Sequence, residues 1–200
     1  YITSVNGQVI KYRIPNVVLD EFNKSNTTTA KYVHKKEAQR AYAGDEIIYT
    51  IEVYNEGLVD GYAQEIVQYI PEGLEFVDDE FNKEQGWQYI AKENKAINTK
   101  LAKQDMGANS EEDKNLIKAY DKETSTISSK KIQLKLKVME NVKVKAKLTT
   151  IAEITKVLVE DRKETLERDS KELVKLPEGT DLINYKDDQL ENEYIPGDED

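Results

Sequence analysis

Few side chains in the sequence have the types and spacing that catalysis requires. His34 is the only histidine and cysteine is absent. A serine–histidine–acid triad therefore lacks convincing partners, and thiol catalysis, disulfides and cysteine-based zinc sites are excluded. No Gly-x-Ser-x-Gly turn, phosphate-binding glycine loop or dinucleotide-binding motif is present, and spacing singles out no pair among the 39 acidic residues. The pattern favours a non-catalytic protein, with His34 at an exposed strand edge.

A second pattern with chemical potential is a row of lysines that alternates with apolar residues. Its members are Lys131, Lys135, Lys137, Lys143, Lys145 and Lys147. Such a strip could bind an anionic polymer, for example wall teichoic acid or a host glycosaminoglycan. Lysines on an outer face also protect a sheet against edge-to-edge pairing. No aromatic residue is interleaved with them in the sequence, which favours protection. A third hypothesis places the acidic end of the chain on this strip.

Acidic residues near the end of the chain could bind calcium. The hard oxygen ligands that calcium prefers are available in one group at Asp161, Glu167 and Asp169, and in a second at Asp187, Asp188, Asp198 and Asp200. Neither spacing matches an EF-hand loop. We therefore expect solvated acids and no cofactor, with calcium as the alternative.

The composition limits the partners of the chain. Its 200 residues are enough for one large domain, and its formal charge of −10 disfavours nucleic acid as a partner. No apolar run approaches the ~20 residues that span a bilayer, so we expect no direct membrane insertion. The chain begins at Tyr1 without a signal-peptide pattern. We interpret it as a segment of a longer protein.

The elements that must position these side chains are mainly strands. Period-two alternation of apolar residues predicts strands at 47–54, 62–70, 132–138, 142–148 and 151–159. Residues 132–148 are expected to form a hairpin that turns at Glu140-Asn141. A capping-box spacing at Ser110 predicts one short helix at about 109–121. Strands without a strand–helix–strand rhythm indicate an antiparallel β-sandwich.

The chain is expected to contain one domain and a tail. Residues 1–176 form the domain, with the core of the sandwich at 31–160. Residues 1–30 supply N-terminal strands or a joint to a preceding unit, and their apolar content favours strands. Residues 177–200 form an acidic linker, because seven acids and no base lie between Asp187 and Asp200.

The order of these motifs resembles a known family. GDEIIYTIEVYNEG, which ends at Gly57, is followed by DGYAQEIVQYIPEGLEFV, which ends at Val77. This order is similar to the conserved-repeat domain (domain-of-unknown-function family eleven) of Gram-positive, clostridia-like cell-surface proteins. The similarity continues to YIPGDED at the end of the chain.

The resemblance implies a fold and a function. The fold would be an immunoglobulin-like β-sandwich, exported and attached to the cell wall, and repeated in tandem as a non-catalytic stalk. Its partners would be the neighbouring repeats of the same polypeptide. The alternative is an adhesin-type binding module that recognises an anionic wall or host polymer through the lysine strip.

The resemblance also raises the question of an internal crosslink. Several surface-repeat families form an amide bond between a lysine and an asparagine, assisted by a buried acid. Thr150 stands where the asparagine would be, and Gln68 stands where the acid would be. Threonine has no carboxamide and glutamine cannot exchange the proton. The sequence therefore predicts no crosslink of this kind.

Overall fold

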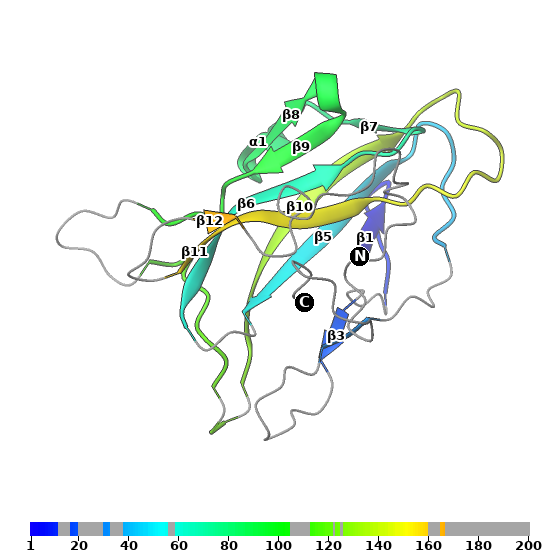
Figure 1. Ribbon diagram of the computed structural model, residues 1–200. Helices are drawn as coiled ribbons and strands as arrows, with labels where there is room; N and C mark the ends of the chain where they lie inside the picture. The colour runs from blue at the N-terminus through cyan, green and yellow to red at the C-terminus, as the bar shows by residue number, and fades with distance from the viewer. Residues whose placement is uncertain are drawn as a thin grey trace, which may run out of the picture.

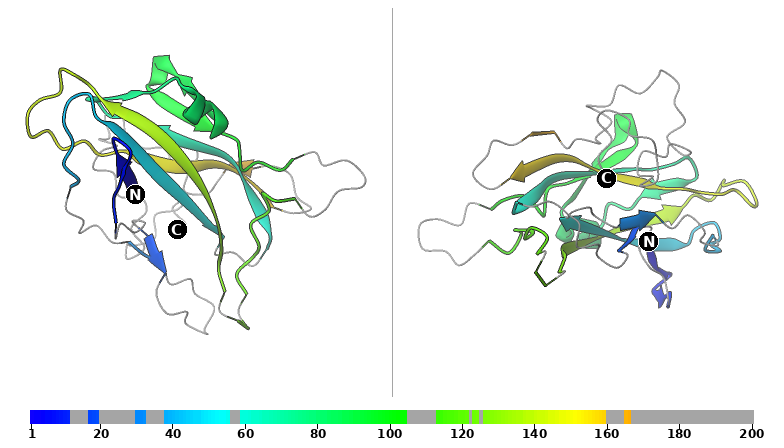
Figure 2. Two further views of the ribbon diagram at one scale, coloured as in Figure 1. Left: turned by 180° about the vertical axis from the view of Figure 1, so that it is seen from behind. Right: turned by 60° about the horizontal axis from the view of Figure 1, so that its bottom comes forward.

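Two antiparallel sheets face each other in the computed structural model, as the edge-on view in Figure 2 (right) shows. The structure describes residues 1–11, 17–19, 30–32, 38–55, 59–104, 113–121, 123–124, 126–159 and 165–166. The β-sandwich that the sequence predicts is confirmed.

The first sheet has the strand order β2-β1-β5-β10-β7 (Figure 1). These strands are β1 (Ile2–Val5), β2 (Gln8–Val9), β5 (Glu46–Asn55), β7 (Leu74–Phe76) and β10 (Ser128–Val138). The longest pairing joins β5 to β10, with Ser128 opposite Asn55 at one end and Lys137 opposite Glu46 at the other.

The second sheet has the order β12-β11-β6-β9-β8. Its strands are β6 (Gly61–Tyr69), β8 (Trp87–Ile90), β9 (Lys95–Asn98), β11 (Ile151–Val159) and β12 (Thr165–Leu166). Two further strands, β3 (Val17–Leu19) and β4 (Ala30–Tyr32), pair with each other. The short helices are α1 (Glu80–Glu84) and the 3₁₀ helix η1 (Ala91–Glu93).

The core lies between the two sheets and is centred on β10. Ile132, Leu134, Leu136 and Val138 alternate with polar residues and are between 0% and 2% exposed. Burial of one such side chain stabilises the fold by about 1.5–3 kcal/mol. The inner face of β10 is therefore a main source of the stability of the sandwich.

Side chains close the edge of β10 that faces away from β5. The strand β7 covers only its last three residues. Beyond β7, the amide of Asn82 bonds both backbone groups of Lys135, at 2.8 Å each. At Gln133, the backbone N–H donates to Gln85 Oε1 (3.1 Å) and the carbonyl accepts from Trp87 Nε1 (2.6 Å). These three side chains replace a missing strand and prevent edge-to-edge pairing there.

The helix predicted at about 109–121 is wrong in position. Residues 109–112 lie outside the described residues, and residues 113–120 form turns and a bridge. Ile117 exchanges two backbone hydrogen bonds with Gly61, at 2.9 and 3.1 Å. Pairing with the start of β6 outweighs a three-turn helical signal that has little stability alone. The short α-helix lies instead at α1, where Asp79 caps the N-terminus by accepting from the backbone N–H of Asn82.

The hairpin predicted at 132–148 is also wrong. Residues 139–150 contain no strand and connect β10 in the first sheet to β11 in the second. A returning strand would need a free edge of β10, but β5, β7 and the capping side chains occupy both edges. Val142 and Leu148 instead turn inward and pack against the core.

We predict that removing the cap of β10 destabilises the whole sandwich. Asn82→Ala leaves a buried backbone N–H and C=O of Lys135 without partners, which should cost about 2–4 kcal/mol. Urea unfolding measures the loss. Asn141→Ala, at an exposed turn, is the matched control and should stay within about 0.5 kcal/mol of the wild type. Equal stabilities of the two variants would contradict the role of the cap.

Candidate functional site

The lysine strip is divided into two parts by the fold. Its first half lies on the outer face of β10, where acids on neighbouring elements neutralise it. The pairs are Lys131–Glu52 (3.3 Å), Lys135–Glu46 (3.5 Å), Lys135–Asp79 (2.5 Å) and Lys137–Glu75 (3.6 Å). This half ties β10 to β5, β7 and the start of α1.

Lys135 is the most enclosed member of this half. Its side chain is 16% exposed, and its ammonium group lies 5.3 Å from the centroid of the Phe81 ring. The hydrogen bond to Asp79 raises the pKa of Lys135, although burial opposes the shift. Burial raises the pKa of Asp79, but hydrogen bonds from Lys135 and from the backbone of Asn82 outweigh it, so that this pKa is lowered. The pair stays charged, which suits an ion pair and not a nucleophile.

The second half of the strip lies on the connection between β10 and β11. Lys143, Lys145 and Lys147 are exposed, and none forms an ion pair with a described residue. Val144 between them is 91% exposed. Among the described residues, therefore, no acid neutralises these three lysines.

At the two positions where a crosslink would form, neutral hydrogen bonds join buried groups. Gln68 is 2% exposed, and its Nε2 donates to the carbonyls of Ile151 (2.6 Å) and Tyr69 (3.0 Å). Thr150 forms a side-chain hydrogen bond with Tyr49. Tyr49 belongs to the first sheet and Thr150 lies beside β11 of the second. A hydrogen bond therefore connects the two sheets at Thr150, the position where the resemblance would place a crosslinking asparagine.

The environment of Tyr49 is apolar. Burial raises the pKa of Tyr49 to about 12, and the hydrogen bond to Thr150 opposes the shift only in part. Such a site disfavours charge. None of the side chains of Gln68, Tyr49 and Thr150 is a nucleophile that attacks a carboxamide at neutral pH.

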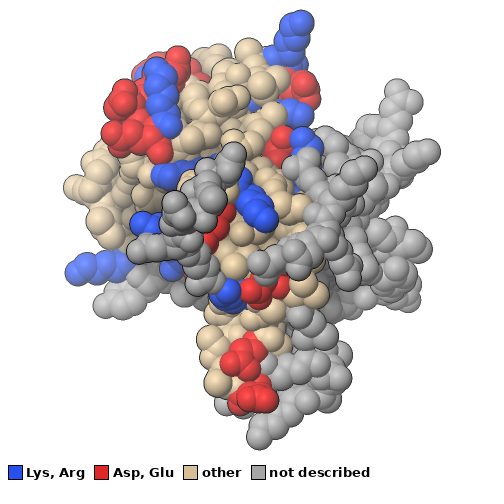
Figure 3. Space-filling model, turned by 90° about the vertical axis from the view of Figure 1, so that its left-hand side faces the viewer, with Lys and Arg blue, Asp and Glu red and all other residues tan. Residues whose placement is uncertain are grey.

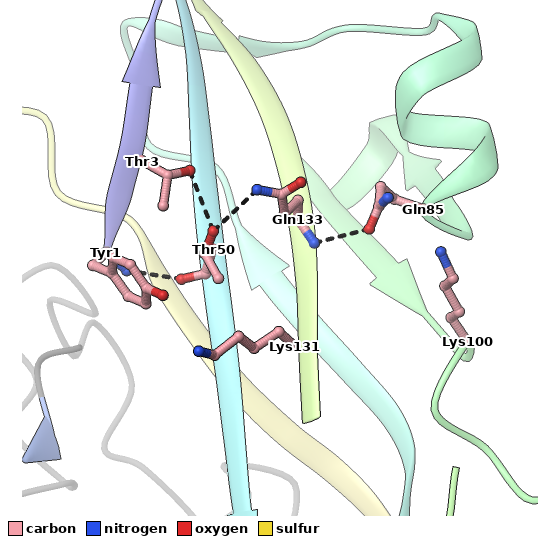
Figure 4. A pocket seen from close by; sticks show the side chains of 7 residues that line it. All are labelled: Tyr1, Thr3, Thr50, Gln85, Lys100, Lys131 and Gln133. Atoms are coloured by element: carbon pink, nitrogen blue, oxygen red, sulfur yellow. Dashed lines mark hydrogen bonds between the residues drawn. The ribbon is translucent and has the colours of Figure 1, made fainter. Parts of the chain in front are cut away.

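A polar hollow of about 530 Å³ lies on the outer face of the first sheet (Figure 4). Thr50 donates to Thr3 Oγ1 (3.2 Å) and accepts from Gln133 Nε2 (3.3 Å), so that one chain of hydrogen bonds crosses β1, β5 and β10. Lys100 donates to the carbonyl of Glu84 (2.9 Å) at the rim. These groups mainly satisfy one another. The hollow therefore favours a structural role in fastening β1 to the sheet.

The remaining predicted site residues fall outside the described residues. They are His34, Asp161, Glu167, Asp169, Asp187, Asp188, Asp198 and Asp200. Within the described ranges, no three His, Cys, Asp or Glu side chains are placed to hold a metal ion. None of the helices in these ranges has the length and apolarity that a membrane crossing requires.

Comparison of the chain with protein-family models, curated proteins and solved structures finds no match.

Several residues that organise this face have no signal in the sequence. Thr3, Thr50 and Gln133 come from three distant segments, and only the register of β1, β5 and β10 brings them together. Asn82 and Gln85 occupy a segment that carries no strand pattern. Thr50 is the exception, because it is a polar residue within the mainly apolar sequence of β5.

The buried hydroxyl of Tyr49 predicts a pH dependence of stability. The folded protein keeps this hydroxyl neutral to a higher pH than the unfolded chain does, because its pKa rises from 10.0 to about 12. Its contribution is therefore complete below pH 10 and is lost as pH rises through about 12. Tyr49→Phe should cost about 1 kcal/mol at neutral pH. Urea unfolding at a series of pH values should show this difference shrinking as the pH rises above 10.

Tyr42→Phe is the control, because Tyr42 is 74% exposed. It should follow the wild type at every pH. A Tyr49→Phe difference that stays constant through the alkaline range would contradict the burial of this hydroxyl.

Gln68 and Thr150 occupy the expected acid and asparagine positions of a crosslink, and we therefore predict a chain without one. The intact mass should equal the sum of the residues. A deficit of about 17 Da, one ammonia, would show that another lysine–asparagine pair has reacted and would overturn this prediction.

Proposed function

We propose that the chain is a non-catalytic structural module of a surface protein attached to the cell wall of a Gram-positive bacterium. In this role it spaces other domains from the wall and contacts neighbouring repeats of the same polypeptide. The module would be of the immunoglobulin-like kind. The motif order that ends at Gly57 and Val77 supports the family.

The strand order is the observation that carries this proposal. Immunoglobulin-like sandwiches of the constant type place strands A, B, E and D in one sheet and strands C, F and G in the other. The order β1-β5-β10-β7 corresponds to A-B-E-D, and β12-β11-β6 corresponds to G-F-C. The hairpin of β8 and β9 is an insertion between D and E that extends the second sheet beside C.

A spacer also needs a rigid body and edges that do not fuse with adjacent copies. The apolar inner face of β10 and the long β5–β10 pairing favour rigidity. The cap formed by Asn82, Gln85 and Trp87 blocks pairing along β10. Stacked repeats with open edges would be prone to misassembly. These features support a module that is repeated along one chain.

The surface suits an extracellular position in a crowded polymer. Basic and acidic side chains are interspersed on the face shown in Figure 3. The formal charge of −10 keeps copies apart and soluble. A face on which neither sign of charge dominates is compatible with a stalk.

A display experiment tests the spacer role. The chain is fused between an N-terminal epitope tag and a wall anchor in Gram-positive cells, in one, two or three copies. Antibody labelling of the tag should rise with copy number, because each copy moves the tag further out of the wall. An unrelated immunoglobulin-like module of similar size should give the same labelling. Labelling that does not depend on copy number would contradict the proposal.

A further inference from the structure

Two connections that are far apart in the sequence meet at one end of the sandwich. Residues 38–45 lead into β5 and residues 139–150 lead out of β10, and they lie side by side in Figure 1 and in both views of Figure 2. Gly44 N–H donates to the carbonyl of Val138 (2.9 Å). The Cβ position of Gly44 would lie 3.0 Å from Glu140 Oε1. The fold thus joins these connections into one continuous surface.

The connection at 139–150 is held at its base. Val142 and Leu148 pack against the core and enclose Gly73, whose φ of 98° and close neighbours leave no space for a side chain. Met139 N–H donates to the carbonyl of Gly73 (2.9 Å). The segment between Val142 and Leu148 is therefore anchored to the core at both ends.

The exposed part of this connection is positively charged. Ala146 N–H donates to the carbonyl of Lys143 (3.0 Å), and Lys145 has a φ of 63°, so that a tight turn brings the lysines together. Lys143, Lys145 and Lys147 have no ion pair with a described residue, in contrast to the lysines on β10. Glu140 is the one acid in the sequence of this connection. A local excess of positive charge in a chain of −10 needs an external partner, a solvated face or the acidic end of the chain itself.

Apolar and aromatic surface accompanies these charges. Tyr42 is 74% exposed on the neighbouring connection, and Val144 is 91% exposed between the lysines. The sequence of the strip contains no aromatic residue, but the fold brings the connection that carries Tyr42 beside the connection at 139–150, which carries these three lysines. A tyrosine ring offers a flat apolar face for stacking and a hydroxyl for hydrogen bonding. Lysine ammonium groups bind carboxylate and sulfate as point charges.

We propose that these five residues (Tyr42, Lys143, Val144, Lys145 and Lys147), which we call the crossover patch, bind an acidic polysaccharide. The lysines would bind its carboxylate or sulfate groups, and Tyr42 would stack on a sugar ring. Exposed tyrosine and valine fit a sugar ring better than a bare phosphate chain. The binding role is separate from the spacer role and does not depend on the number of repeats.

Retention on immobilised heparin, a sulfated polysaccharide, tests the proposal with the whole chain. The wild type should be retained at about 150 mM salt, and the triple variant Lys143→Gln, Lys145→Gln, Lys147→Gln should bind about tenfold more weakly, because each surface ion pair is individually weak. The matched control Lys11→Gln, Lys92→Gln, Lys114→Gln removes the same charge from exposed lysines elsewhere. It should bind like the wild type.

A second polyanion tests the role of the ring. Tyr42→Ala should weaken binding to heparin several-fold and leave binding to inorganic polyphosphate, which has no sugar ring, unchanged. The proposal is overturned if the wild type is not retained, if the control triple variant loses as much affinity as the crossover variant, or if Tyr42→Ala acts equally on both polyanions. Thermal unfolding of every variant should match the wild type, because all the substituted side chains are exposed.

Failure of the heparin experiment can be distinguished from failure of the display experiment. A chain that is not retained on heparin would still raise the labelling of the tag with copy number if it is a spacer. If the chain binds heparin but the labelling does not depend on copy number, the crossover patch is supported and the spacer role is contradicted.

Discussion

The strand β10 has both edges and one face occupied, and the rest of the described structure depends on this constraint. Its inner face supplies the apolar centre of the core, and one edge pairs with β5 along nearly its whole length. The short β7 and the side chains of Asn82, Gln85 and Trp87 close the other edge. Because both edges of β10 are occupied from Gln133 to Val138, the chain after Val138 cannot return beside it as a hairpin, and it crosses to β11 in the second sheet. The crossover and its exposed lysines follow from that exit.

A neutral hydrogen bond joins the two sheets at Thr150, the position where the resemblance would place a crosslinking asparagine. Gln68 bonds the carbonyls of Tyr69 and Ile151 within the second sheet, and Tyr49 of the first sheet reaches Thr150 across the interior. Each such bond contributes about 1 kcal/mol, far less than an amide bond. The resistance of a module of this kind to unfolding must therefore come from packing and from long strand pairing.

Period-two alternation of apolar residues predicted the strands at β5, β6, β10 and β11, and along β10 the buried residues alternate as well, because one face of this strand packs against the other sheet. The same alternation failed at 142–148, since the pattern carries no information on which edges of β10 are already occupied. The helix predicted at about 109–121 failed in its described part, 113–121, because Ile117 pairs with Gly61 instead. The lysine strip was visible in the sequence. Its division into a paired half and a half without partners among the described residues was not, because acids such as Glu52 and Asp79 are brought beside the lysines only by the folded structure.

Hydrogen exchange at the backbone amides of β10 tests this account most directly. The amides of Gln133 and Lys135 donate to side chains rather than to a strand. If the cap is part of the cooperative core, these two amides should exchange as slowly as those of Leu134 and Leu136, which lie within the pairing with β5. Rapid exchange at Gln133 and Lys135 beside slow neighbours would show that this edge is open and would contradict a strand enclosed on both sides.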